Sequence, residues 1–122
     1  MADLAVTPTT FIPKKVDAFQ LAAASAVVYT VPANTATKVV SILLVNDTTT
    51  PVTATIYFCP NGGGEDDTMI ICKGMTVPSD GIPVEVLPQG KDYYLNATDT
   101  IEAFASAANQ VTCHISVVEE SA

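Results

Sequence analysis

The sequence contains no arginine and no tryptophan, and it has one histidine and three cysteines among 122 residues. Thirteen acidic residues outnumber five lysines, which gives a net charge of −8. Proteins that recognise nucleic acid neutralise phosphates with arginine and with clusters of lysine, and here only Lys14 and Lys15 are adjacent. We therefore expect no nucleic acid and no membrane surface among the partners of this chain.

The three cysteines, Cys59, Cys72 and Cys113, form no CxxC pair. The sequence does not open with a charged segment followed by an apolar one, as a signal peptide would. It also lacks a run of about 18 apolar residues that could span a membrane. These absences predict synthesis in a reducing cytosol, with thiols that are free and mostly buried.

No cofactor and no metal is expected. Structural zinc sites usually take their ligands in close pairs, whereas the three cysteines and His114 are scattered over separate segments; Cys59 and Cys72 alone could face each other across a hairpin. The acidic run Glu65–Asp67 lacks the alternating spacing of a calcium loop and is interpreted as a solvated loop tip.

No catalytic residue is predicted either. His114 follows Cys113 directly, and on a strand two neighbours point to opposite faces, so they cannot act together. The GxSxG motif of a nucleophile elbow is absent from the sequence. We expect a protein that is not an enzyme.

What the chain does contain is a series of short apolar segments, each closed by turn residues. Such segments at close intervals predict an all-β protein: one antiparallel β-sandwich of about eight strands, either a jelly roll or Ig-like. The expected strands are 27–31, 38–46, 52–59, 68–74, 82–87, 91–96, 100–106 and 111–119.

Several strands alternate between apolar and polar residues. In 111–117 the apolar positions share one face, and in 52–58 Tyr57 falls on the face of the threonines. Residues 39–45 are apolar on both faces, which indicates a central strand or one covered by a partner. The apolar fraction of 48% also favours a surface partly covered by other subunits.

Residues 1–18 are interpreted as an extended N-terminal arm, and residues 19–122 as the β-sandwich domain. Prolines at positions 8 and 13 bias the arm away from helix. Phe11 and Ile12 suggest that the arm docks, either as a first edge strand on its own sandwich or on a neighbouring subunit. The predicted protein-interface residues are Phe11, Ile12, Lys14, Lys15 and Tyr57.

Three segments carry a resemblance to a known group of proteins: Tyr29-Thr30-Val31-Pro32-Ala33-Asn34, Ile42 to Asn46, and Ala105 to Glu119. With them, residues 26–119 resemble small virion proteins of tailed bacteriophages. The resemblance implies a β-sandwich that serves as a building part of the virion. It transfers no catalytic residue.

The resulting hypothesis is a non-enzymatic capsid decoration (cement) protein that binds and stabilises the capsid lattice. It would be a homo-oligomer, a trimer or dimer, partnered by the major capsid protein or other virion proteins. Its location would be the virion, after synthesis in the cytoplasm of the host bacterium. The alternatives are a neck, tail or fibre-base component, and a host-attachment module that binds glycan through exposed tyrosines such as Tyr57 or Tyr94.

Overall fold

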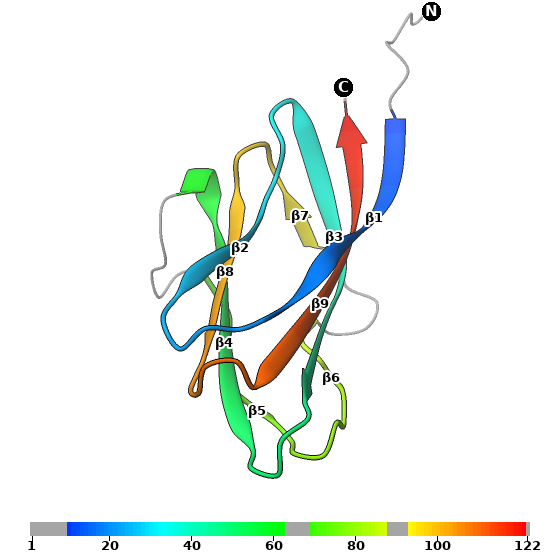
Figure 1. Ribbon diagram of the computed structural model, residues 1–122. Helices are drawn as coiled ribbons and strands as arrows, with labels where there is room; N and C mark the ends of the chain where they lie inside the picture. The colour runs from blue at the N-terminus through cyan, green and yellow to red at the C-terminus, as the bar shows by residue number, and fades with distance from the viewer. Residues whose placement is uncertain (1–9, 63–68, 88–92, 122) are drawn as a thin grey trace, which may run out of the picture.

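The protein is described by a computed structural model over residues 10–62, 69–87 and 93–121 (Figure 1). The described residues form a two-layer β-sandwich without an α-helix, as the turn-bounded apolar segments predicted. The elements are β1 (Thr10–Gln20), β2 (Ala26–Thr30), β3 (Thr35–Asn46), β4 (Val52–Cys59), the short 3₁₀ turn η1 (Pro60–Gly62), β5 (Ile70–Val77), β6 (Val84–Glu85), β7 (Tyr93–Leu95), β8 (Thr100–Ala105) and β9 (Val111–Ser121).

The strands form two antiparallel sheets whose order is not the order of the chain. The first sheet has the order β1-β9-β3-β6, with β7 pairing further along β3, and the second has the order β2-β8-β4-β5. Consecutive strands at the start of the chain therefore alternate between sheets. This order is that of a jelly roll, with β6 and β7 sharing the position of one edge strand. Of the two predicted alternatives, the jelly roll is the one observed.

The core lies between the two inner faces and follows the predicted two-residue period. In β9 the buried apolar residues are Val111, Cys113, Ile115 and Val117, while the residues between them are half-buried. The central strand β3 contributes fully buried residues as well, which confirms that 39–45 form a central strand. Its contributions to the core are Val39, Ile42 and Leu44.

The N-terminal strand β1 pairs with β9, from Thr10 opposite Ser121 to Gln20 opposite Thr112. Of the two predicted ways for the arm to dock, residues 10–20 thus take the first, as an edge strand of their own sandwich. The strand continues through the boundary predicted between residues 18 and 19. Residues 1–9 of the predicted arm lie outside the described residues, as does the acidic run at 65–67.

The turn after β3 is built by the side chain of Asn46, which is fully buried. Its Oδ1 accepts hydrogen bonds from the backbone N–H of Thr48 at 3.0 Å and from the Thr48 hydroxyl at 2.6 Å. Its Nδ2 donates to the carbonyl of Thr50 at 2.8 Å. An asparagine that mimics a backbone turn in this way ends a strand without leaving buried polar atoms unpaired.

Candidate functional site

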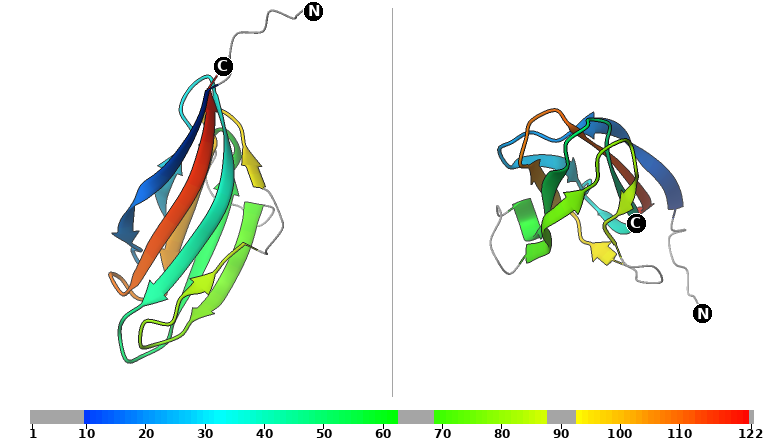
Figure 2. Two further views of the ribbon diagram at one scale, coloured as in Figure 1. Left: turned by 90° about the vertical axis from the view of Figure 1, so that its right-hand side faces the viewer. Right: turned by 90° about the horizontal axis from the view of Figure 1, so that it is seen from below.

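Three strands far apart in the sequence present one continuous outer face, which Figure 2 (left) shows with β1, β9 and β3 side by side. Directly opposed residues of antiparallel strands point to the same side. Phe11 of β1 and Ala36 of β3 both oppose Glu120 of β9, and Pro13 and Lys38 both oppose Val118. These residues therefore share the face of the first sheet that points away from the core.

A bulge in β3 adds an apolar residue to this face. The register with β9 shifts between Val39 and Ser41, so that Val40 is the extra residue. Val39 is fully buried, whereas Val40 is 52% exposed. A β-bulge redirects side chains in this way. Here it places Val40, which has no partner residue on β9, beside Pro13 and Val118 on the outer face.

The short strand β7 contributes an exposed aromatic ring. Tyr94 lies opposite Lys38 in the β3–β7 pairing and is 68% exposed. Its neighbour Tyr93 points the other way and packs edge-on against Phe58, with ring centroids 6.0 Å apart. The adjacent tyrosines thus place one ring inside and one outside, as the strand period predicted.

The outer face is hollowed at the end where β1 begins and β9 ends. A groove of about 320 Å³ is lined by apolar side chains together with Lys38 and Glu120. Its apolar walls come from Phe11, Tyr94 and Val118. A second shallow depression borders Val118 on its other side and is lined in part by Lys15 and Val40. We call this region, from Phe11 to Val40 across Val118, the outer-face surface.

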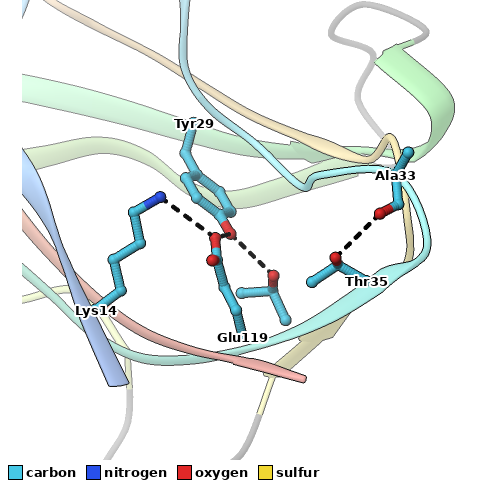
Figure 3. A network of polar contacts seen from close by, with 6 residues as sticks. Lys14, Tyr29, Ala33, Thr35 and Glu119 are labelled. Carbon is cyan, nitrogen blue, oxygen red and sulfur yellow. Dashed lines mark hydrogen bonds and ion pairs between the residues drawn. The ribbon is translucent and has the colours of Figure 1, made fainter. Parts of the chain in front are cut away.

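Beneath the outer-face surface, a polar network connects the two sheets (Figure 3). The hydroxyl of Tyr29, in β2, donates a 2.6 Å hydrogen bond to Oε2 of Glu119, in β9, and lies 2.9 Å from Oγ1 of Thr37, in β3. Nζ of Lys14, in β1, is 3.6 Å from the same oxygen of Glu119. The network therefore joins three neighbouring strands of the first sheet to an edge strand of the second.

The environment of Tyr29 keeps its hydroxyl protonated. Burial raises the pKa of this phenol well above its usual range, and the hydrogen bond to Glu119 raises it further. A neutral phenol remains a donor to the carboxylate at any physiological pH. The hydrogen bond between Tyr29 and Glu119 is thus a fixed structural connection between β2 and β9, the strand with which β1 pairs.

Four of the five predicted interface residues lie together on β1. Phe11 is 64% exposed and Ile12 is 47% exposed, and Lys14 and Lys15 are exposed beside them. The pairing with β9 puts Phe11 and Lys15 on the outer face, and Ile12 and Lys14 on the side that faces the second sheet. That these residues contact a partner remains a prediction.

Tyr57 lies elsewhere and is only 9% exposed. It is in β4 of the second sheet, where its ring stacks on Phe104 with centroids 6.4 Å apart. The four predicted residues of β1 belong to the other sheet. Val40, Val118 and Tyr94 were not among the predicted protein contacts; for Val40 the only signal was the apolar character of both faces of 39–45.

The cysteines and the histidine are placed for packing. Burial, with a smaller contribution from Cys72, raises the pKa of Cys113 to about 12, so that its thiol stays protonated. His114 points to the opposite face, beside Leu43. Cys72 lies opposite Ile56, and Cys59 lies opposite Thr100 on the other neighbour of β4, so Cys59 and Cys72 do not face each other.

Within residues 10–62, 69–87 and 93–121, no group of three or more His, Cys, Asp or Glu side chains is arranged to hold a metal ion. None of these segments forms a helix of the length and apolar character needed to cross a bilayer.

Comparison with known proteins identifies the fold. No family model and no curated protein matches the sequence. Among solved structures, a chain of the Bacillus endospore appendages, described as a novel family of disulfide-linked pili, has a TM-score of 0.54 and 20% identity, covering 99% of this chain and 96% of that one. Chains of infectious bursal disease virus match at a TM-score of 0.39 with 11% identity (Gx strain) and 0.35 with 13% identity (T13 particle). This chain spans about a third of their length, with 32% and 31% covered. At 20% identity, the likeness to the appendage chain shows a shared fold and nothing further.

Proposed function

We propose that this chain is a non-enzymatic structural subunit, which works by binding other protein subunits through the outer-face surface. The observation that carries the proposal is the grouping of three exposed apolar side chains around Val118: Phe11, Val40 and Tyr94. Contiguous apolar patches on a protein surface mark sites of interaction. Here a β-bulge brings one of them, Val40, to the surface.

The reactive side chains of the described residues support a structural role. A thiol nucleophile must ionise, and Cys113 is fully buried with its pKa raised to about 12. A histidine base must reach its nucleophile, and His114 points to the opposite face of β9 from Cys113. These groups contribute to packing rather than to a reaction.

More specifically, we propose a capsid decoration protein of a tailed bacteriophage, with the major capsid protein as its partner. The resemblance of residues 26–119 to small phage virion proteins supports this role. Jelly rolls also occur among viral capsid domains, and the fold is shared with a chain of an assembled bacterial appendage. A protein that binds the assembled shell and not its free subunits stabilises the shell by mass action.

The test is the number of copies in purified particles, measured by quantitative mass spectrometry against the major capsid protein. Hundreds of copies per particle, together with density on the outer capsid lattice in electron micrographs, are the expected result. A dozen copies or fewer would assign the chain to the neck, tail or fibre base instead. Absence from particles would overturn a virion role altogether.

One observation favours a second function, the binding of a glycan. Tyr94 exposes its ring at the edge of a groove of about 320 Å³, a volume at the lower end of small-ligand pockets. Jelly rolls also occur among lectin domains. Binding on a glycan array that is lost in Tyr94→Ala and kept in Tyr93→Phe would favour this function, and an array without any signal would exclude it.

A further inference from the structure

The groove at the start of β1 combines apolar walls with positive charge. The walls are supplied by Phe11, Tyr94 and Val118, and Lys38 also lines the groove. Lys15 lies next to the groove on the same face of β1, opposite Ser116 of β9, and borders the second depression. Among the described residues, Glu120 is the one carboxylate that lines the groove. Of the described lysines, Lys15 and Lys38 lie on this outer face, whereas Lys14 points to the second sheet and pairs with Glu119.

The connection between β5 and β6 has the opposite character. Ile82 projects from it with 56% of its surface exposed, although it is a large apolar residue. Asp80 in the same connection is exposed, and so is Asp47, whose side chain lies beside Gly81. We call these three residues, Ile82, Asp80 and Asp47, the acidic tip.

The backbone of the acidic tip is held in place by the turn after β3. The N–H of Asp80 donates to the carbonyl of Thr48 at 2.9 Å, and the N–H of Gly81 donates to the carbonyl of Asn46 at 2.8 Å. Asp80 and Gly81 both have positive φ, at 67° and 77°, as a tight turn requires. Ile82 is therefore presented on a preorganised turn, which lowers the entropy lost on binding.

The groove and the acidic tip lie at opposite ends of the same strand. Lys38 is near the start of β3, and Asn46, which binds the tip, is its last residue. Eight residue-to-residue steps along the strand, at about 3.3 Å each, separate them by roughly 26 Å. Figure 1 likewise shows the β5–β6 connection at the end of the sandwich away from the chain ends. The tip of one molecule therefore cannot enter its own groove.

We propose that the acidic tip of one copy of this chain docks into the groove of a second copy. Ile82 would lie against Phe11, Tyr94 and Val118, and the aspartates would face Lys15 and Lys38. The inference rests on the proposed function, since it names a second copy as one partner of the outer-face surface. A single contact of this kind between two copies joins two different surfaces, so its repetition yields a closed ring or an open chain, whereas a reciprocal pair of these contacts yields a two-fold dimer.

The ion pairs and the apolar contact of Ile82 contribute differently to the proposed interface. Ion pairs at the rim of an interface add little affinity but select the partner and fix its orientation. Burial of Ile82 in the groove supplies the attraction. Association is therefore expected to weaken when an acidic residue replaces an apolar one on either surface, because the change removes burial and adds repulsion or an unpaired charge.

The experiment uses three matched substitutions of exposed apolar residues by aspartate. Phe11→Asp alters the groove, Ile82→Asp alters the tip, and Val27→Asp alters β2 in the other sheet, where the side chain is 54% exposed. Each full-length variant is first shown to melt within a few degrees of the wild type. Light scattering over a concentration series then gives the mass of the wild type and of each variant.

The expected result is that the wild type and Val27→Asp associate alike, whereas Phe11→Asp and Ile82→Asp each remain monomeric. A mixture of the two monomeric variants should form dimers and nothing larger, because only the intact tip of one fits the intact groove of the other. A two-fold contact between identical surfaces would not give this complementation.

Several results would overturn the inference: a wild type that is monomeric at every concentration, association that Ile82→Asp leaves unchanged, or a mixture that stays monomeric. These light-scattering results do not bear on the copy number per particle, and that number tests the proposed function separately. A monomeric protein found in hundreds of copies per particle would retain the structural role and lose the contact between copies.

Discussion

The hydroxyl of Tyr29 donates a 2.6 Å hydrogen bond to Oε2 of Glu119, and this bond joins the edge strand of one sheet to the last strand of the other. Glu119 is 9% exposed, so its carboxylate has little access to water. Removing the donor leaves a buried charge with fewer partners, which costs more than the bond itself contributes. The stability of the sandwich therefore depends on this pair of residues.

We predict that Tyr29→Phe lowers the free energy of unfolding by about 2 kcal/mol, the usual range for a hydrogen bond to a charged group. Urea denaturation followed by circular dichroism measures the change. Tyr94→Phe is the matched control, because its ring is exposed, and it should leave the urea midpoint unchanged. Equal midpoints for Tyr29→Phe and the wild type would show that the bond contributes nothing to stability.

The ion pair between Lys14 and Glu119 should contribute much less. The lysine side chain is 48% exposed and the two charged atoms are 3.6 Å apart, and partly exposed pairs contribute at most about 1 kcal/mol. Lys14→Gln should therefore lower stability slightly at low salt and have no effect at high salt. Lys15→Gln changes the next residue, on the opposite face of β1, and should leave stability unchanged at low and at high salt. An equal loss of stability in Lys14→Gln and Lys15→Gln would mean that the net charge of the protein, and not this ion pair, is responsible.

Two neighbouring valines in β3 should behave in opposite ways. Val39 is fully buried and Val40 is 52% exposed, because the bulge turns the second out of the core. Val39→Ala should cost about 2 kcal/mol through lost burial and the cavity that remains. Val40→Ala should change stability by less than about 0.5 kcal/mol, and a comparable loss in both, measured by urea denaturation, would contradict the bulge.

Stability should fall in alkaline solution because of Cys113. Burial raises the pKa of its thiol from 9.0 to about 12 in the folded chain, so the folded state holds its proton where the unfolded state has lost it. The contribution is complete below pH 9 and is lost between pH 9 and pH 12, with a slope of up to about 1.4 kcal/mol per pH unit for one group. The raised pKa of Tyr29 acts in the same direction.

Cys113→Ala should therefore flatten, but not abolish, the decline of unfolding free energy over this range. The slope is compared with that of the wild type, so that the cost of the cavity left by the substitution does not enter. An unchanged slope would show that Cys113 ionises equally readily in both states.

The sandwich itself could be predicted because its strands repeat a local pattern. The alternation in 111–117 is the burial pattern of β9, and Asn46 ends β3 as its turn chemistry indicates. Sheet membership could not be predicted, because it depends on pairings between distant segments, such as Thr10 with Ser121. A two-residue period fits a jelly roll and an Ig-like sandwich equally well.

The predicted interface residues and the proposed outer-face surface differ for a related reason. A strict alternation of apolar and polar residues along a strand does not predict the register shifts that the structure contains. The shift after Val39 exposes Val40, and shifts between β4 and β5 flank Ile56, next to Tyr57, which is buried against Phe104. The bulge in β5 is marked by Gly74, with φ of 60°, whose N–H binds Oγ1 of Thr55. Such irregularities are set by tertiary packing and leave little trace in the residue pattern.

The position of β9 between β1 and β3 has a consequence for the synthesis of the protein. β1 and β3, two strands from the first half of the chain, are joined in this sheet through β9, with which each of them pairs. The first sheet therefore cannot form while β9 is still inside the ribosome. Once β9 is available, folding is expected on the millisecond-to-second timescale typical of non-local β topologies, and until then the apolar residues of β3 stay exposed to aggregation and to chaperones.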